Sequence, residues 1–211
     1  VWKTYLGRPE ADQIRILAIN QLGNGLSVAG HHKDALPVRE AELSMKKRLG
    51  VSYSSILIAQ GNLASTYQNL GRLKESIRLR QEVYSGRLKV DGEEHYLTLT
   101  AANNYASTLG TLRRFKEVKS VLRKTIPVTR RVVGESHEVT LRMRDIYATA
   151  LYFDPDATLE DLREAVTTLD DLAPTARRVL GGAHPLTVDI EGELRDARAA
   201  LLARETPPES S

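Results

Sequence analysis

The apolar residues of this chain recur at helical spacing, in blocks that repeat along the sequence. One stripe has apolar residues three or four positions apart, which is the pattern of a buried helix face: Ile56, Ala59, Leu63, Tyr67 and Leu70. Gly71-Arg72 interrupts the pattern, and a second stripe then runs to Gly92. Each block therefore predicts two helices, A and B, joined by a short turn.

The end of each block carries the same turn, Gly-x-x-His followed by Thr. Copies stand at 92–98, 134–140 and 181–187, and a worn copy, Gly50-Val-Ser-Tyr53, lies upstream. The glycines step by 42, 42 and 47 residues, and a fixed period in this range marks a repeat architecture. We expect the histidines to pack and hydrogen-bond at the turn. Equivalent turns lie two interhelix steps of ~8 to 10 Å each apart, too far for one zinc ion.

The pattern predicts an all-α solenoid of about four 42-residue helix-turn-helix repeats with a C-terminal capping helix. Helix A is expected at 11–29, 54–70, 96–112 and 138–153, and helix B at 33–49, 73–91, 115–133 and 158–180. The capping helix is expected at 185–203. The repeats span about 11–50, 51–92, 93–134 and 135–181 within a domain of residues 1–204, and 205–211 reads as a disordered tail or linker.

Several residues mark the ends and interruptions of these helices. Gly92, Gly134 and Gly181 are expected to close helix B as left-handed residues. Pro127 and Pro174 each remove a backbone hydrogen bond inside helix B, which predicts a kink or a split. Repeat four has a longer connection between its helices, ending at Thr158 as the expected N-cap.

Composition narrows the classes of protein. The 211 residues contain no cysteine, which excludes disulfides and thiolate sites and fits the reducing cytoplasm. Apolar runs are far shorter than a membrane span, and no signal peptide is visible. Because the chain starts at Val1, we expect it to be a segment of a longer protein.

The net charge of +3 is unevenly distributed. Residues 113–144 hold ten Lys and Arg against three acids, whereas 154–211 hold six Arg against thirteen acids. The basic stretch favours an acidic partner. We take as the basic stretch the six cations at the start of this range, Arg113, Arg114, Lys116, Lys119, Arg123 and Lys124.

The repeat resembles a named family. The helix A stretch Leu-Ala-Ser-Thr-Tyr-Gln-Asn-Leu-Gly-Arg-Leu-Lys-Glu-Ser (63–76), followed a helix later by Gly-x-x-His, is similar to the 42-residue tetratricopeptide repeats of kinesin light chains. The turn Gly-Gly-Ala-His-Pro-Leu-Thr at 181–187 is nearest to that pattern. The resemblance covers residues 14–200 and implies a right-handed solenoid with a concave groove lined by the A helices. It also makes kinesin heavy chain a partner by resemblance alone, although the heptad segment that grips it is not seen in these residues.

In such repeats, the resemblance implies that Asn before the Leu-Ala pair of helix A points into the groove. An asparagine amide both donates and accepts, so it can pair with the backbone of an extended peptide. The candidate groove residues are Asn20, Gln21, Asn62, Ser65, Gln68, Asn69, Asn103, Asn104 and Ser107. The alternative is that the asparagines only tie neighbouring helices together. We call this row of groove residues the polar ladder. Asp145-Ile146 replaces the asparagines in repeat four, so we expect the polar ladder to stop there.

No motif for catalysis, nucleotide binding, a metal or a cofactor is present. Gly23-Asn-Gly25 lacks the third glycine of a dinucleotide loop, and no phosphate-loop Gly-Lys-Ser/Thr or His-Glu-x-x-His occurs. We therefore predict a non-enzymatic, cofactor-free module that binds a protein or peptide, without membrane association. Nucleic-acid binding through the basic stretch and a purely architectural spacer are the alternatives.

Overall fold

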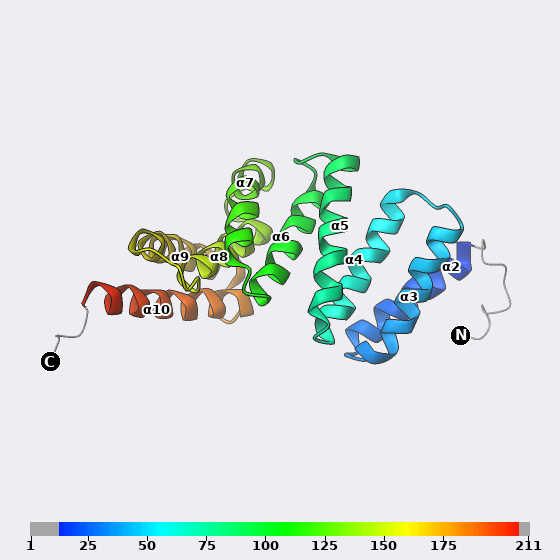
Figure 1. The fold of residues 1–211 in the computed structure, drawn as a ribbon, viewed down its shortest axis with the longest axis horizontal. Helices are drawn as coiled ribbons and strands as arrows, with labels where there is room; N and C mark the ends of the chain where they lie inside the picture. Colours follow the sequence, from blue (N-terminus) through cyan, green and yellow to red (C-terminus); the bar gives the residue numbers. More distant parts are fainter. Residues whose placement is uncertain (1–12, 207–211) are drawn as a thin grey trace. The chain divides into compact units, whose positions relative to one another are not determined.

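The computed structural model describes residues 13–206, which form nine α-helices and no strand (Figure 1). Their bounds are α2 Gln13–Val28, α3 His32–Arg48, α4 Tyr53–Asn69, α5 Leu73–Asp91, α6 Tyr96–Thr111, α7 Phe115–Val133, α8 Glu138–Tyr152, α9 Leu159–Leu180 and α10 Pro185–Glu205. The predicted all-α fold of helical hairpins is confirmed. Residues 11 and 12 of the first predicted helix, and 207–211 of the expected tail, lie outside the described residues.

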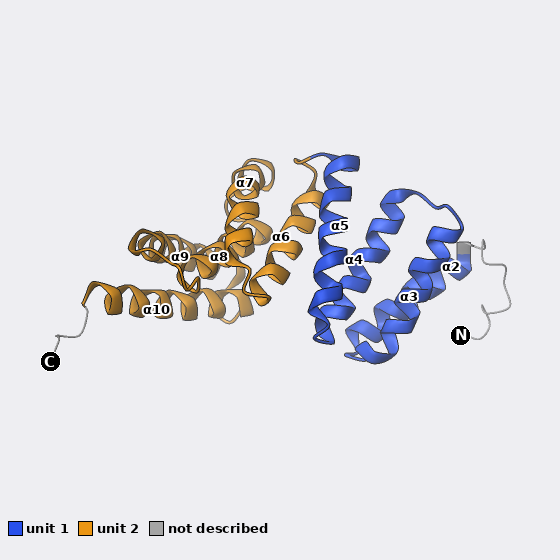
Figure 2. Ribbon diagram, in the orientation of Figure 1, with its two compact units in different colours: residues 1–92 blue, residues 93–211 orange. Residues whose placement is uncertain are grey.

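The helices fall into two compact units, residues 1–92 and 93–211 (Figure 2). In unit 1, α3 packs on α2 and α4, and α4 packs on α5. In unit 2, each helix from α6 to α10 packs on the next, and the hairpin-starting helices α6, α8 and α10 also contact one another in sequence. The A helices of unit 2 therefore form a layer of their own.

Each unit has its own apolar core. In unit 1, Leu43, Leu63 and Leu79 pack together with two alanines from α4. In unit 2, the largest fully buried side chains come from every helix: Leu99, Leu109, Leu122, Val118, Leu141, Met143, Leu151, Leu169, Leu172 and Ile190. The alanine that recurs on helix A is fully buried in all three copies, Ala64, Ala106 and Ala148, because only a small side chain fits where helices pack closely.

The repeated histidine starts helix A in unit 2. His95, His137 and His184 are the N-caps of α6, α8 and α10. In each, the ring Nδ1 accepts a hydrogen bond of 3.2 Å from the backbone N–H two residues on. An N-cap acceptor satisfies one of the otherwise unpaired N–H groups of the first turn. The predicted structural role of these histidines is confirmed.

The glycines before these histidines differ from the prediction. Gly92, Gly134 and Gly181 have φ of 82°, 93° and 91°, as expected, but ψ of 172°, 163° and 153°. This is not the left-handed helical region but an extended region that glycine alone adopts readily. The chain therefore leaves helix B in an extended direction, because it must reach the histidine cap rather than wrap back over the helix end.

The worn copy at Gly50 has a different geometry. Here the N–H of Val51 donates to the carbonyl of Lys46 at 3.3 Å, which wraps the chain back over α3. Ser52 rather than Tyr53 is the N-cap of α4, and its hydroxyl accepts from the N–H of Ser55. The upstream turn is thus one residue shorter than its copies and uses a different cap.

Neither proline splits its helix, so that part of the prediction is wrong. α7 continues from Phe115 to Val133 through Pro127, and α9 continues from Leu159 to Leu180 through Pro174. A proline removes one backbone hydrogen bond, but the turns on either side retain theirs and remain packed on the neighbouring helices. As predicted, Thr158 caps α9, in a reciprocal capping box with Asp161.

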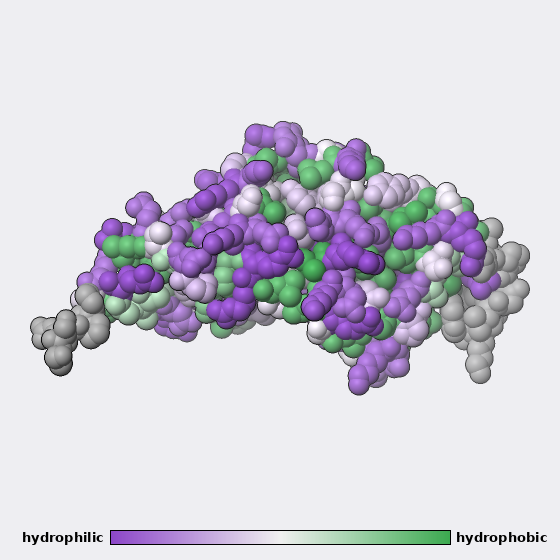
Figure 3. All heavy atoms as spheres, viewed as in Figure 1, coloured by the Kyte–Doolittle hydropathy of each residue, from purple (hydrophilic) through white to green (hydrophobic). Residues whose placement is uncertain are grey.

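The face seen in Figure 3 is largely hydrophilic, with hydrophobic residues scattered in small groups. Exposed apolar side chains such as Val188 and Leu202 are of the kind that all proteins carry. Within residues 13–206, none of the helices combines the length and the apolar character needed to cross a membrane.

Candidate functional site

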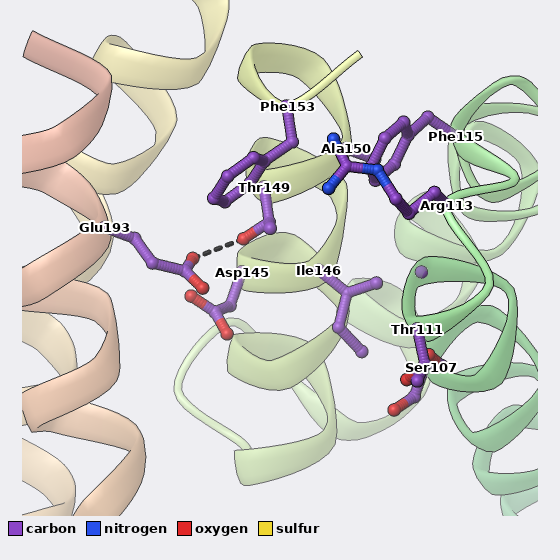
Figure 4. Close-up of a pocket in the computed structure, with 11 residues that line it drawn as sticks. Ser107, Thr111, Arg113, Phe115, Asp145, Ile146, Thr149, Ala150, Phe153 and Glu193 are labelled. Carbon is purple, nitrogen blue, oxygen red and sulfur yellow. Dashed lines mark hydrogen bonds between the residues drawn. The ribbon is translucent and has the colours of Figure 1, made fainter. Parts of the chain in front are cut away.

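A pocket of about 480 Å³ opens in unit 2 among the A helices (Figure 4). We call it the A-helix pocket. It is lined by α6, the α6–α7 turn, the start of α7, α8 and α10, through Ser107, Gly110, Thr111, Arg113, Phe115, Asp145, Ile146, Thr149, Ala150, Phe153 and Glu193. Three of its lining helices, α6, α8 and α10, are A helices.

Helix α8 supplies the wall of the A-helix pocket. Asp145, Ile146, Thr149, Ala150 and Phe153 recur at spacings of one, three or four, so they lie along one side of the helix. Phe153 follows the helix as its C-cap and is 44% exposed, at the start of the long connection peculiar to repeat four. The wall is therefore mostly apolar with one acid in it.

Two carboxyl groups face each other at one end of the pocket. Asp145 comes from α8 and Glu193 from α10, and the hydroxyl of Thr149 donates to Glu193 (Figure 4). Asp145 is 8% exposed, and its Oδ1 has no hydrogen-bond partner among the described residues. Burial, followed by the charge of Glu193, raises the pKa of Asp145 far above its usual range. Burial also raises the pKa of Glu193.

The opposite side of the pocket is polar and carries a cation. Ser107 and Thr111 lie on α6, and the guanidinium of Arg113 lies 5.6 Å from the centre of the Phe115 ring (Figure 4). Arg113 has φ of 56°, a conformation that costs roughly 1–2 kcal/mol for a residue with a Cβ. Gly71 occupies this position one repeat earlier, with φ of 72°. An arginine held in a strained turn beside a pocket is typical of a functional position.

The predicted groove residues of unit 1 have different environments. The amide of Asn20 donates to Glu42 of α3 at 2.9 Å, so Asn20 ties two helices together, as the alternative for these asparagines states. Ser65 accepts from Arg80 at 2.8 Å and Asn69 lies 3.5 Å from the ring of His32. Gln68 is half-buried. Gln21 is exposed and Asn62 half-buried, and neither side chain hydrogen-bonds to a described residue.

The predicted groove residues of unit 2 lie on α6. Asn103 is 9% exposed and donates to Asn104 at 3.4 Å, but its Oδ1 has no partner within the described part of the chain. Ser107, half-buried, is the one member of the predicted set that lines the A-helix pocket. The acceptors left unpaired at Asn103 and Asp145 are 42 residues apart, so the polar ladder changes its chemistry at repeat four.

Most cations of the basic stretch are bound within unit 2. Arg114 pairs with Glu117, Lys116 with Asp156 and Lys119 with Asp154, at 2.6, 2.8 and 2.9 Å. Arg123 donates to the Tyr147 hydroxyl at 2.9 Å. Arg113 and Lys124 make no ion pair with a described residue. The local positive field is therefore much weaker than the residue count implies.

Sequence reasoning missed most of the pocket. Glu193, Phe153 and Phe115 carry no repeated pattern, and Arg113 was noted only for its charge. Two signals were available: an acid in the ladder position of repeat four, and arginine where the preceding repeat has the turn glycine. Both are departures from the repeat.

No group of three or more His, Asp or Glu side chains within residues 13–206 is placed to hold a metal ion. The titratable pair in the pocket is two acids, one of which accepts from the Thr149 hydroxyl. The arrangement can accept hydrogen bonds and attract a positive charge.

Comparison with known proteins agrees with this architecture. Residues 55–131 match the model of the tetratricopeptide repeat. Two crystal structures of nearly identical TPR-like repeats, from a candidate kinesin light chain of Podosopora anserina, superpose with TM-scores of 0.74 and 0.72 at 20% identity. The alignments cover 90% and 95% of this chain and 88% and 91% of those chains. BtubC (BKLC) from P. vanneervenii gives a TM-score of 0.61 at 16% identity, covering 100% of this chain and 92% of that one. A comparison with curated proteins found no significant match.

The fold thus places the chain among helical-repeat proteins, a class typical of protein–protein interaction scaffolds. Residues 55–131 match the tetratricopeptide repeat, and the fold of the chain is similar to that of kinesin light chain-type repeats, as the sequence resemblance predicts.

Proposed function

We propose that this chain is a non-enzymatic interaction module that binds a peptide segment of a partner protein on its A helices. The observation that carries the proposal is the A-helix pocket, which is open, mainly apolar in its wall, and lined by the helices that such repeats use for binding. Pockets that combine apolar walls with a few convergent polar groups are the usual sites of ligand recognition.

Polar groups on an A helix of each unit support the proposal. Asn62 of α4 has no hydrogen bond from its side chain to a described residue, and Asn104 of α6 only accepts one, from Asn103. Such amides can pair with the backbone of an extended segment, whatever its side chains. Asn20 does not belong with them, because its amide is already bound inside unit 1.

The partner class follows from the same contacts. An acidic partner, expected from the basic stretch, would rest on Arg113 and Lys124, since the other cations are engaged by acids or Tyr147. Nucleic acid needs a run of free cations for phosphate contacts, so the same pairing disfavours it. We place the module in the cytoplasm on its cysteine-free composition.

The test is selection of a random 12-residue peptide library displayed on phage against the chain, followed by measuring the affinity of the enriched peptides by fluorescence anisotropy. Ser107→Trp, which fills the pocket, should weaken binding at least tenfold, because it removes the space that the peptide occupies. Asn62→Ala with Asn104→Ala should also weaken it without lowering the melting temperature.

The matched control is Ser44→Trp, at an exposed position on α3, which should bind as the parent does. If no peptide is enriched, the module does not bind peptides through this pocket. The same follows if Ser107→Trp binds the enriched peptides as tightly as Ser44→Trp does. An architectural spacer would then be the better account.

A further inference from the structure

We propose that the A-helix pocket receives a lysine or arginine side chain of the bound segment, with Glu193 and Asp145 as its anionic end. This inference rests on the proposed function, because it names the chemistry of the residue that anchors the partner.

The first support is an acceptor that the fold leaves unused. Asp145 is 92% buried, and its Oδ1 has no partner among the described residues. A buried acceptor without a donor destabilises the fold, because it has lost its hydrogen bonds to water. A donor that enters beside Glu193 would offset this cost, and lysine and arginine carry three and five N–H donors respectively.

The second support is the charge around the pocket. Asp189 and Glu193 of α10 act on Asp145 of α8, Asp196 of α10 acts on Glu193, and none of the four makes an ion pair with a described residue. The nearest cation of α8, Arg142, is bound to Glu138 at 2.7 Å. Arg113, the cation in the pocket lining, lies on the opposite side, so the end formed by Asp145 and Glu193 is negative and attracts a cation from outside.

The third support is the shape of the wall. Ile146, Ala150 and Phe153 line the pocket from the same helix as Asp145 (Figure 4). Lysine and arginine combine an apolar stem with a charged head, so they fit a site with an apolar wall and an anionic end. A short acid such as aspartate would match neither part.

The two carboxyl groups also predict a proton release. Burial and their mutual repulsion favour one shared proton in the free protein, which is why the pKa of Asp145 is raised. The charged or titratable groups around it are Arg113 of the α6–α7 turn, Arg142 and Tyr152 of α8, and Asp189, Glu193 and Asp196 of α10. A bound cation compensates the second negative charge, so the shared proton is lost when the cation binds.

The direct probe is butylguanidinium, a mimic of the arginine side chain, titrated into the ¹⁵N-labelled chain and followed by NMR at neutral pH. Saturable shifts are expected at residues 145–153 and 193, while butylurea, its uncharged analogue, should cause none there. Glu193→Gln keeps the bond to Thr149 but removes the charge, and should weaken binding about tenfold or more. Glu160→Gln, the same change on α9 outside the pocket, should leave it unaltered.

Calorimetry in two buffers of different ionisation enthalpy should detect release of a proton on binding of butylguanidinium, and Asp145→Asn should abolish that release. Equal binding of butylguanidinium and butylurea, or unchanged affinity in Glu193→Gln, would overturn the inference.

The phage-display selection separates this inference from the proposed function. Enriched peptides that depend on Ser107 but show no basic residue, or a basic residue insensitive to Glu193→Gln, would leave the module standing and refute the cation pocket. Saturable butylguanidinium binding without any enriched peptide would retain the pocket chemistry and refute the module.

Discussion

Asp145 occupies the position that Asn103 holds one repeat earlier, and both side chains are almost completely buried. An amide at this position is neutral, whereas a carboxyl must either lose its solvation or keep its proton. Burial, followed by the charge of Glu193 on α10, raises the pKa of Asp145 and so favours its protonated form. A buried carboxyl that has no ion-pair partner in the fold lowers its stability at neutral pH. Such a residue is typical of a site retained for binding.

The pH dependence of stability should show this directly. Because the folded state binds the Asp145 proton more tightly than the unfolded chain, stability is highest below the unfolded pKa of about 3.9 and falls as the pH rises from there. Asp145→Asn removes the group whose ionisation destabilises the fold at high pH. It should raise the free energy of unfolding by about 1–3 kcal/mol at pH 8 and by little near pH 4.

Urea denaturation at the two pH values measures this difference, with Glu160→Gln on the surface of α9 as the control. A stabilisation of Asp145→Asn that is the same at both pH values would show that the carboxyl is not protonated in the fold.

At the scale of the helices, the unusual turn geometry is the feature that distinguishes the three Gly-x-x-His copies. Gly134 has φ of 93° and ψ of 163°, a region closed to side chains with a Cβ. A Cβ built there would meet no atom within 4 Å, so any cost of substitution comes from the backbone alone.

Gly134→Ala should therefore lower the free energy of unfolding by about 1–3 kcal/mol, measured by urea denaturation. Gly25→Ala is the matched control, because Gly25 is exposed inside α2 and a Cβ there is equally unobstructed. It should be neutral or stabilising by up to about 1 kcal/mol, since alanine favours helix. Equal effects of the two substitutions would contradict the geometry of the turn.

At the scale of the molecule, the two units bury different kinds of residue. Unit 1 buries Arg39, Glu42, Lys46, Arg80 and Arg87, whereas the fully buried large apolar side chains are concentrated in unit 2. Glu42 accepts from Arg39 at 3.0 Å and from Lys46 at 2.8 Å. Burial alone would raise the pKa of Glu42, but hydrogen bonds from Lys46, Asn20 and Arg39 outweigh it and lower the pKa.

Buried ion pairs contribute less to stability than apolar residues of the same volume, because of their desolvation cost. In a repeat protein, stability is close to a sum over repeats and their interfaces. We therefore expect amide hydrogen exchange of residues 141–151 in α8 to be roughly ten- to a hundredfold slower than that of α3 and α4. Uniform protection across both units would mean that the chain unfolds as one cooperative body.

Much of the fold was predictable because it depends on local pattern. Helical spacing and the period of the turn located the helix ends to within about two residues wherever they are described. The splits at Pro127 and Pro174 were wrong, since packing on neighbouring helices outweighs one lost backbone bond. The prediction that the turn glycines are left-handed helical residues was wrong in the angle ψ, because the chain must run on in an extended direction to reach the histidine cap.

The site was less predictable, because a pocket joins residues that no period relates. Ser107 was in the expected set, but Glu193 of α10 reaches Asp145 only through the packing of α8 on α10. Asn20 and Asn62 read alike in the sequence, yet one is bound to Glu42 and the other has no such partner.

The sequence by itself determined the helices, their pairing and the structural role of the turns, since these follow from apolar spacing and from backbone groups that must be capped locally. Tertiary structure alone decided which polar side chains form hydrogen bonds or ion pairs within the described fold and which do not. Hydrogen bonds and ion pairs between helices depend on distances that spacing along the chain does not encode. Asp145 and Glu193, the two acids that line the A-helix pocket without an ion pair to a described residue, are the clearest result of that difference.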